Sequence, residues 1–151
     1  MIHCIQTNSE NEQFQKLVGK LDADLKIRDG DDHLFYDQFN KIDSIKFAVV
    51  AYNDELPVGC GAIKEYAAGV MEVKRMYVLP GSRNQGIASA ILKQLERWAI
   101  ELAIGKLLLE TGFNQPEAIA LYKKSGYLII PNYGQYENIA NSVCFEKVLD
   151  N

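Results

Sequence analysis

The sequence predicts an α+β (mixed α/β) domain, in which a mostly antiparallel twisted sheet of about seven strands is flanked by about four helices. Three observations lead to this prediction. Three strand-like segments follow one another in the middle of the chain, a long amphipathic helix comes next, and strands and helices then alternate. With 151 residues, 48% of them apolar, the chain has the size and core content of one domain covering residues 1–151.

The first part of the chain predicts one strand and two helices. Residues 2–6 are expected to form a strand. Apolar residues recur at helical spacing over residues 10–26 and predict a helix there. The polar run at residues 28–32 is expected to end it, and a second, short helix is expected at residues 32–40.

A meander of three strands, joined by polar turns, occupies the middle of the chain. Gly59 and Gly61 lie in the second of these strands and allow close approach by another element. Pro80 and Gly81 are expected to end the third strand. The expected strands are residues 45–52, 58–66 and 70–79.

The rest of the chain alternates helices and strands. A long amphipathic helix is expected to begin near Ile87 and to end at Gly105. The apolar run at residues 107–109 is typical of a central strand covered on both faces. A further helix is expected to begin at Pro116 and to end at Gly126. The closing strands are expected at residues 127–130 and 143–148.

Composition narrows the functional class. No apolar run reaches the ~18 residues that cross a membrane, and the first residues lack the features of a signal peptide, so a cytoplasmic protein without a membrane partner is expected. The net charge of −4 and the lack of a basic patch argue against a nucleic-acid partner. Cys4, Cys60 and Cys144 are odd in number and far apart, so neither a disulfide framework nor a metal site is expected.

Residues 83–88, with the sequence Arg-Asn-Gln-Gly-Ile-Ala, have the form of a phosphate-binding loop. They precede a helix N-terminus, whose unsatisfied N–H groups and macrodipole attract phosphate. Gly86 and Ala88 would let a diphosphate approach the backbone, and Arg83 adds positive charge. An ordinary strand-to-helix turn would explain the loop as well. The glycine spacing does not match the Gly-x-Gly-x-x-Gly of dinucleotide-binding folds.

The pattern Arg83-x-x-Gly86-x-Ala88 resembles the [Arg/Gln]-x-x-Gly-x-[Gly/Ala] motif of the GCN5-related N-acetyltransferase (GNAT) superfamily. Residues 110–127 resemble the second CoA-binding segment of that family, whose core has the form Ala-x-x-x-Tyr-x-x-x-Gly-[Phe/Tyr]. The resemblance covers residues 70–127. It implies a single GNAT-like domain that moves an acetyl group from acetyl-CoA to a primary amine. A small-molecule acceptor is favoured over a protein, with small amines, amino acids, antibiotics and protein N-termini all left open. The core pattern of the second CoA-binding segment is matched here at Ala118, Tyr122, Gly126 and Tyr127.

The resemblance also implies which residues bind acetyl-CoA, the expected co-substrate. In the family, the loop binds the pyrophosphate of CoA, and the backbone of the preceding strand pairs with the pantetheine arm. Asn114 is expected either to contact the pantetheine or to cap the helix that follows it. The implied CoA-binding residues are Met76, Tyr77, Val78, Arg83, Asn84, Gln85, Gly86, Ile87, Ala88, Ser89, Asn114 and Ala118.

Acetyl transfer needs an acid for the leaving thiolate and a base for the proton of the amine. The resemblance assigns the acid to Tyr122, which could instead be a packing aromatic. Glu72 is the first candidate base, since histone-acetylating members carry a catalytic Glu at this offset, and Glu110 is the second. Burial would raise either pKa toward neutrality. Each carboxylate could instead pair with Lys74 or Arg75, and some family members use a water chain.

Other residues have two interpretations each. Arg75 could hold a substrate carboxylate or form a structural ion pair. Three tyrosines could wall the acceptor pocket or simply pack, and both histidines are expected at the surface. These residues are Tyr36, Tyr133, Tyr136, His3 and His33.

An alternative function from another class is a non-catalytic acetyl-CoA-binding or sensing domain. It would keep the loop but would not need Tyr122 or a base. The resemblance also allows a homodimer, because many members of the family dimerise. The acceptor itself cannot be identified from the motifs, and the first 44 residues are expected to form the substrate side.

Overall fold

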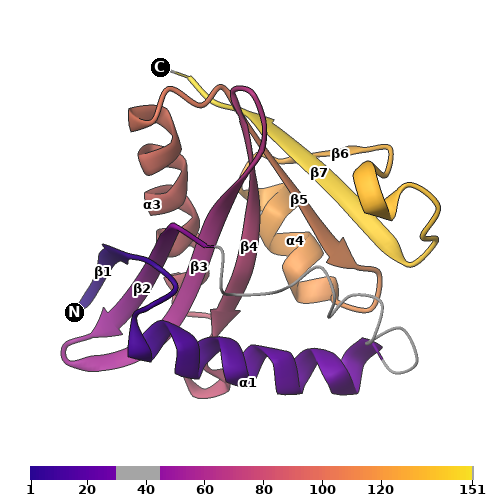
Figure 1. Cartoon of the computed structure of the whole chain (residues 1–151). Helices are drawn as coiled ribbons and strands as arrows, with labels where there is room; N and C mark the ends of the chain where they lie inside the picture. Colours follow the sequence, from indigo (N-terminus) through magenta and orange to yellow (C-terminus); the bar gives the residue numbers. More distant parts are fainter. Residues whose placement is uncertain (30–44, 151) are drawn as a thin grey trace.

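One sheet of seven strands runs through the molecule (Figure 1). The computed structural model describes residues 1–29 and 45–150. The strands are β1 (Ile2–Thr7), β2 (Phe47–Asn53), β3 (Leu56–Ala67), β4 (Val70–Val78), β5 (Lys106–Gly112), β6 (Leu128–Ile130) and β7 (Ser142–Val148). Their order is β1-β2-β3-β4-β5-β7-β6, and only the β4–β5 pair is parallel. The mostly antiparallel sheet confirms the predicted fold class.

Three α-helices are present in the described residues: α1 (Glu12–Asp29), α3 (Ile87–Glu101) and α4 (Pro116–Lys124). Short 3-10 turns lie at Pro80–Ser82 (η2) and Gly134–Tyr136 (η3). The helix expected at residues 32–40 lies outside the described part of the chain. Within that part, no helix has the length and apolarity needed to cross a membrane.

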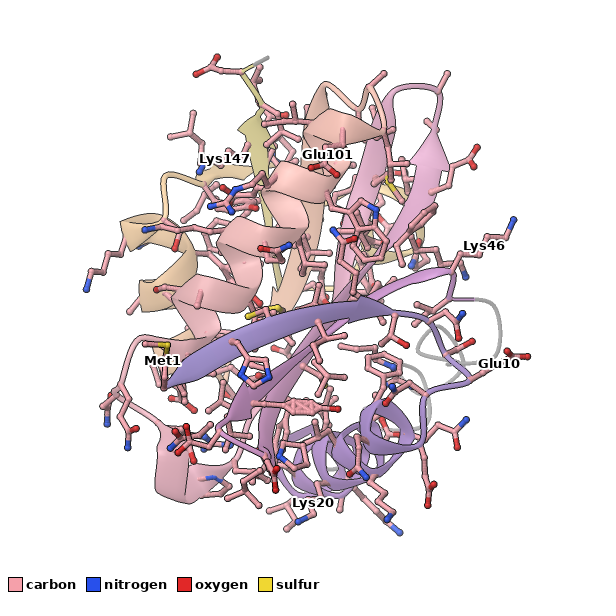
Figure 2. All side chains as sticks on the ribbon, turned by 90° about the vertical axis from the view of Figure 1, so that its left-hand side faces the viewer. Met1, Glu10, Lys20, Lys46, Glu101 and Lys147 are labelled. Atoms are coloured by element: carbon pink, nitrogen blue, oxygen red, sulfur yellow. The ribbon has the colours of Figure 1, made fainter. Side chains whose placement is uncertain are left out.

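The helices cover opposite faces of the sheet, and β2 shows how the sequence produces this. Successive strand residues point to opposite faces. Ala48 and Val50 pack in the cluster that contains the apolar residues of α1, whereas Val49 and Ala51 pack in the cluster formed with α3 and α4. Both sets are fully buried, which explains why β2 is almost continuously apolar. Charged side chains such as Lys20 and Glu101 lie on the outer surface of the helices (Figure 2).

Helix α3 packs closely on β3 at Gly59 and Gly61, the two glycines expected to allow close approach of the backbone. A Cβ atom on Gly59 would lie 2.9 Å from the carbonyl oxygen of Tyr77 and 3.0 Å from Cδ1 of Ile91. A Cβ atom on Gly61 would come within 2.8 Å of Cγ2 of Ile91. Because real Cβ atoms do not approach other atoms so closely, larger residues here would push α3 off the sheet.

Two predicted boundaries were wrong. Residues 28–32 were expected to end α1. The first two of them, Arg28 and Asp29, are helical, because α1 continues to Asp29. Helix α3 ends at Glu101 and not at Gly105. Ala103 takes the left-handed conformation that usually favours glycine, with φ +62°, and the N–H of Ile104 donates to the carbonyl of Ala99 at 2.9 Å. By contrast, α4 begins at Pro116 and is closed by Gly126 at φ +91°, as predicted.

A bulge in β4 opens the sheet. Arg75 has φ +60°, and the pairing register of β4 with β3 shifts between Cys60 and Ala62. The Cys60 thiol donates to the Arg75 carbonyl at 3.3 Å. On its other side, β4 pairs with β5 only from Val70–Lys106 to Glu72–Leu108, after which the two strands diverge (Figure 1). The carboxyl ends of β4 and β5 therefore border a gap in the sheet, which other elements must line.

Candidate active site

The predicted phosphate loop leads directly into α3. Gly86 is the N-cap residue, with φ +77°, and Asn84 also has a left-handed backbone, with φ +64°. A Cβ atom on Gly86 would have no neighbouring atom within 4 Å, so the space before the helix is open. The first N–H groups of a helix have no partner within it and carry the positive end of the dipole. The loop therefore has the space and the electrostatics for a diphosphate.

A groove of about 630 Å³ runs from this loop between β4 and α4. Leu21 and Asp24 of α1 border the groove as well. Nothing in the sequence of α1 predicted that these residues would line it. Of the residues expected to bind CoA, the groove is lined by Met76, Tyr77, Val78, Arg83, Asn84, Gly86, Ile87, Ala88, Ser89 and Ala118.

Two of the expected CoA-binding residues do not line the groove. Gln85 and Asn114 are exposed. The N-cap residue of α4 is Gln115, one position after the cap considered for Asn114, and its side chain makes no capping hydrogen bond. Gln115 lines the groove instead. Its position just before Pro116 could have identified it from the sequence, because the residue before a helix-opening proline takes the N-cap position.

Arg83 holds the loop against β4. Its Nε donates to the carbonyl oxygen of Val78 at 2.9 Å, and its guanidinium lies 5.6 Å from the centroid of the Tyr77 ring. Asp24 of α1 lies 4.0 Å from the guanidinium. The positive charge thus forms part of the groove wall and is anchored by the strand and by α1.

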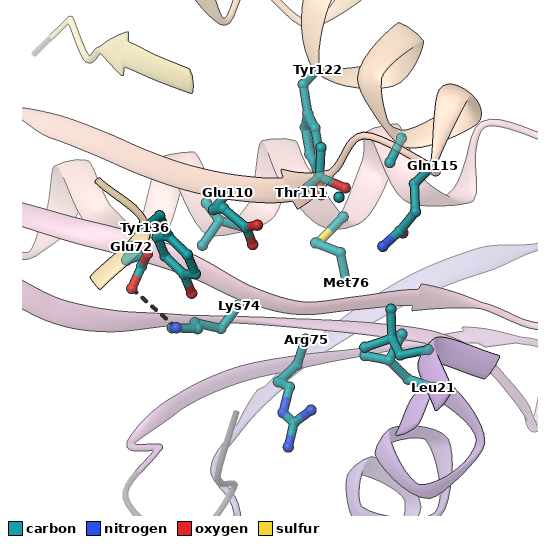
Figure 3. Close-up of a pocket in the computed structure, with 14 residues that line it drawn as sticks. Leu21, Glu72, Lys74, Arg75, Met76, Glu110, Thr111, Gln115, Tyr122 and Tyr136 are labelled. Carbon is teal, nitrogen blue, oxygen red and sulfur yellow. Dashed lines mark ion pairs between the residues drawn. The ribbon is translucent and has the colours of Figure 1, made fainter. Parts of the chain in front are cut away.

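A second, smaller cavity of about 110 Å³ adjoins the groove (Figure 3). Five residues line both spaces, and four charged side chains line the smaller cavity alone, two acidic and two basic. The shared residues are Leu21, Met76, Gln115, Ala118 and Tyr122, and the charged ones are Glu72, Lys74, Arg75 and Glu110.

Tyr122, the expected acid, lies at the junction of the two spaces. It is 6% exposed, and its ring packs on Tyr127 and Phe145 at centroid distances of 5.9 and 5.8 Å. Burial, and then the nearby Glu110 carboxylate, raise the pKa of Tyr122 well above its usual value. The phenol is therefore protonated at neutral pH.

A model of the acetyltransferase (GNAT) family matches residues 10–127. The chain belongs to this family. Its relatives include the IAA acetyltransferase of Azospirillum brasilense, which is 39% identical over 102 residues and aligned over 67% of each chain. The protein is thus a GNAT N-acetyltransferase.

Solved structures show the same fold. A protein of Klebsiella pneumoniae with the provisional name acyl-CoA N-acyltransferase is 28% identical, with a TM-score of 0.83 over 99% of both chains. PaiA N-acetyltransferase from Thermoplasma acidophilum, solved in complex with coenzyme A, is 16% identical. Its TM-score is 0.73 over 98% of this chain and 99% of its own, a likeness of fold.

Of the two candidate bases in this GNAT domain, Glu72 has two neighbours that hold it in place. Lys74 Nζ lies 3.2 Å from its Oε1, and the hydroxyl of Tyr133 donates to its Oε2. The Glu72 and Lys74 side chains are only 7% and 10% exposed. Pairing with Lys74, one of the alternatives considered for this carboxylate, is what the structure shows.

Glu110, the other candidate base, follows the apolar part of β5. Glu110 was expected at the end of this strand, and the strand continues two residues further, to Gly112, because Glu110 and Thr111 pair with Cys144 and Val143 of β7. This extension carries the Glu110 carboxylate to the cavity. The carboxylate is close enough to Tyr122 and Tyr136 to raise the pKa of both.

The remaining expected residues are distributed over several places. Tyr136 is 3% exposed and lines the cavity, and Tyr133 packs edge-on against it at 5.8 Å. Arg75 Nη1 donates to Asp22 of α1 at 2.7 Å, which is the structural ion pair considered for it. His3 is exposed and stacks on Tyr52. Tyr36 and His33 lie outside the described residues.

The three cysteines are free thiols, and Cys60 and Cys144 are buried. Burial raises the pKa of Cys60 to about 12 and that of Cys144 to about 11, which makes both thiols unreactive at neutral pH. Within residues 1–29 and 45–150, no group of three or more His, Cys, Asp and Glu side chains is arranged to hold a metal ion.

Proposed function

We propose that this GNAT enzyme transfers the acetyl group of acetyl-CoA to the primary amine of a small molecule in the cytoplasm. The observation that carries the proposal is the position of Tyr122, which lines both the groove behind the phosphate loop and the small charged cavity. The groove is the donor site and the cavity is the acceptor site, so the two substrates meet at a buried acid.

The donor site fits acetyl-CoA at both ends. The diphosphate would lie at the N-terminus of α3, where Gly86 leaves open space. The pantetheine arm would run along the stretch of β4 beyond its pairing with β5, past Met76 and Val78, toward Tyr122. Gln115 replaces Asn114 as the polar side chain that α4 directs at this arm.

The chain supplies an acid for the leaving sulfur. A tyrosine phenol is protonated at neutral pH, so Tyr122 has a proton to give to the leaving sulfur. The acid is held rigidly, because Tyr127 and Phe145 fix the position of its ring. A fixed acid loses little entropy in the transition state.

We assign the base to Glu110 and not to Glu72. The acid and the base serve the same reacting carbon, so the base must lie near Tyr122. Glu110 and Tyr122 line the same small cavity, and the Glu110 charge adds to the rise in the pKa of Tyr122, which supports this assignment. Glu72 is occupied by Lys74 and Tyr133 and serves to fix them.

The acceptor site is small. A water molecule needs about 10–15 Å³ of such space, so a cavity of about 110 Å³ holds roughly ten waters or a small amine. The name of the relative from Azospirillum brasilense, IAA acetyltransferase, also supports a small-molecule acceptor.

Thiol release from acetyl-CoA tests this function. The protein is incubated with acetyl-CoA and a panel of small primary amines, and free CoA is measured with a thiol reagent. We expect release above the rate of hydrolysis for at least one amine, with peptides of the same amine content slower. If CoA binds but no amine accelerates thiol release, the domain is a non-catalytic acetyl-CoA-binding or sensing domain.

A further inference from the structure

We infer that Lys147 is a positioning residue, which fastens the C-terminal end of α4 to Glu96 of α3 and so holds the Tyr122 hydroxyl at a fixed distance from the phosphate loop. Lys147 lines neither the groove nor the smaller cavity. It therefore acts through α4 and not by contact with a substrate. The inference rests on the proposed function, because it concerns the acid of that reaction.

Helix α4 has little buried surface to hold it in place. It is nine residues long, and Tyr122 is its one buried residue. Helix α3, on the same face of the sheet, is 15 residues long and buries Ile91, Leu92 and Leu95, among others. Tyr122 lies in the last turn of α4, just before the C-cap residue Ser125. An anchor at this end of the helix would keep the hydroxyl in one place.

Lys147 of β7 supplies such an anchor. Its Nζ donates to the carbonyl oxygen of Ser125 at 2.9 Å and to Oε1 of Glu96 at 3.0 Å. The Lys147 and Glu96 side chains are 28% and 13% exposed, so the ion pair is partly shielded from water. The last carbonyl groups of a helix have no partner within it, and a cation there also interacts favourably with the helix dipole.

Glu96 connects the anchor to the donor site. It lies on α3, whose N-terminus forms the proposed diphosphate site. A helix rises about 1.5 Å per residue, so Glu96 lies roughly 15 Å from Gly86 along a rigid rod. The strand that carries Lys147 also carries Phe145, whose ring packs on Tyr122. Both ends of the donor site are thus held to one frame. Misplacement by about 1 Å can lower a rate on the order of 10²-fold.

The bridge does not depend on the hydroxyl of Tyr127. That hydroxyl donates to Oε2 of Glu96 at 2.9 Å, whereas Lys147 binds Oε1. The Tyr127 ring packs on Tyr122 and would remain in Tyr127→Phe. The anchor is therefore assigned to Lys147 and Glu96.

The variant Lys147→Met keeps a long apolar side chain but removes the ammonium group. We expect it to lower kcat at least fivefold and to change the Kd of CoA less than about threefold. Lys147→Arg can still reach Glu96 and should restore most of kcat. A native kcat in Lys147→Met, or no rescue by arginine, would overturn the inference.

Lys106→Met is the matched control. It removes an ion pair with Glu146, at 3.5 Å, which joins β5 to β7 and is also partly exposed. We expect this variant to keep kcat within twofold of the native value. If it lowered kcat as much as Lys147→Met, loss of any ion pair in this sheet would explain the effect, and the inference would fail.

A double variant tests whether Lys147 acts through the acid. When Tyr122→Phe has already removed the hydroxyl, Lys147→Met should change kcat less than twofold, because nothing remains to be positioned. A further loss of fivefold or more in this background would show that Lys147 acts by another route.

Hydrogen exchange separates the inference from the proposed function. If no amine is turned over, or if Tyr122→Phe keeps a native kcat, the proposed function or its acid fails, but the anchor is still tested. The N–H of Tyr127 donates to the carbonyl of Tyr122 at 3.0 Å. Relative to the amides of β2, exchange of this N–H should be at least tenfold faster in Lys147→Met and unchanged in Lys106→Met. Equal exchange in the native protein and Lys147→Met would refute the anchor.

Discussion

The hydroxyl of Tyr133 donates a hydrogen bond to Glu72, which lies 61 residues earlier in the chain. Lys74 Nζ lies 3.2 Å from the other oxygen of the same carboxylate. The three side chains join the β4 strand to the segment before η3, and two of them, Glu72 and Lys74, line the smaller cavity. These contacts support our proposal that Glu72 holds Lys74 and Tyr133 in place and that Glu110 accepts the proton of the amine.

Exchange of each carboxylate for its amide separates these roles. We expect Glu110→Gln to lower kcat at least tenfold, because the amide cannot accept the proton, with little change in the free energy of unfolding. Glu72→Gln should lower the free energy of unfolding by about 1–3 kcal/mol, because Lys74 loses its buried partner. Steady-state kinetics and urea unfolding give both quantities. The reverse pattern would make Glu72 the base.

Removal of the Tyr122 hydroxyl tests the acid. Tyr122→Phe should lower kcat about tenfold or more and leave the Kd of CoA nearly unchanged, since only the proton donor is lost. Tyr127→Phe is the matched control, because the neighbouring hydroxyl donates to Glu96 and does not line either cavity. An unchanged kcat in Tyr122→Phe removes the acid role.

The phosphate loop is tested by a change of charge. Gly86→Glu should abolish CoA binding in a calorimetric titration, because it places bulk and negative charge where the diphosphate would lie and forces a side chain to φ +77°. Gly81→Glu introduces the same charge in the preceding turn, outside the groove, and should leave the Kd within about threefold. Retained binding in Gly86→Glu would refute the assignment of the loop.

The ion pair between Asp22 and Arg75 should contribute measurably to stability. Asp22→Ala leaves a buried guanidinium without this partner, and we expect a loss of about 1–3 kcal/mol in the free energy of unfolding. The exposed pair of Glu12 and Lys16 provides the control, since Glu12→Ala should change that free energy by less than about 0.5 kcal/mol. Equal losses in the two variants would show that burial does not strengthen the pair.

The buried tyrosines predict a loss of stability at alkaline pH. Burial raises the pKa of Tyr122, Tyr133 and Tyr136 above the usual value near 10 that they regain on unfolding. Above pH 10 the unfolded chain therefore loses protons that the folded chain retains. Each group then lowers the free energy of unfolding by up to about 1.4 kcal/mol per pH unit, with the full stability present below pH 10. Urea unfolding at pH 8 and pH 11 measures the difference, and Tyr122→Phe should show a smaller decrease.

The sequence predicted helices and strands well where a proline or glycine marks the boundary or contact of an element. Pro116 and Gly126 delimit α4, and Gly59 and Gly61 identify the strand on which α3 packs. The bulge at Arg75 has no such signal, because it arises from the pairing of β4 with β3. The contacts that define the acceptor cavity were equally hidden.

These contacts join side chains far apart in the chain, and only the assembled sheet brings them together. Tyr133 reaches Glu72 of β4 from the segment that connects β6 to β7. Glu110 reaches the cavity because β5 extends past its apolar run. The motifs therefore identified the lining of the groove more completely than that of the smaller cavity, whose residues come from β4, β5, α1, α4 and the segment around η3.

The short pairing of β4 with β5 leads us to expect that a bound acetyl donor stabilises the fold. The two strands are joined at only three residue pairs, and a bound donor would bridge the rest of the gap. A ligand that binds only the folded state adds RT ln(1 + [L]/Kd) to stability, about 2.7 kcal/mol when its concentration is 100 times Kd. In a cell short of acetyl-CoA, the unliganded chain would open more often at this seam and be degraded by proteases sooner. The supply of acetyl donor would then set the abundance of this enzyme as well as its rate.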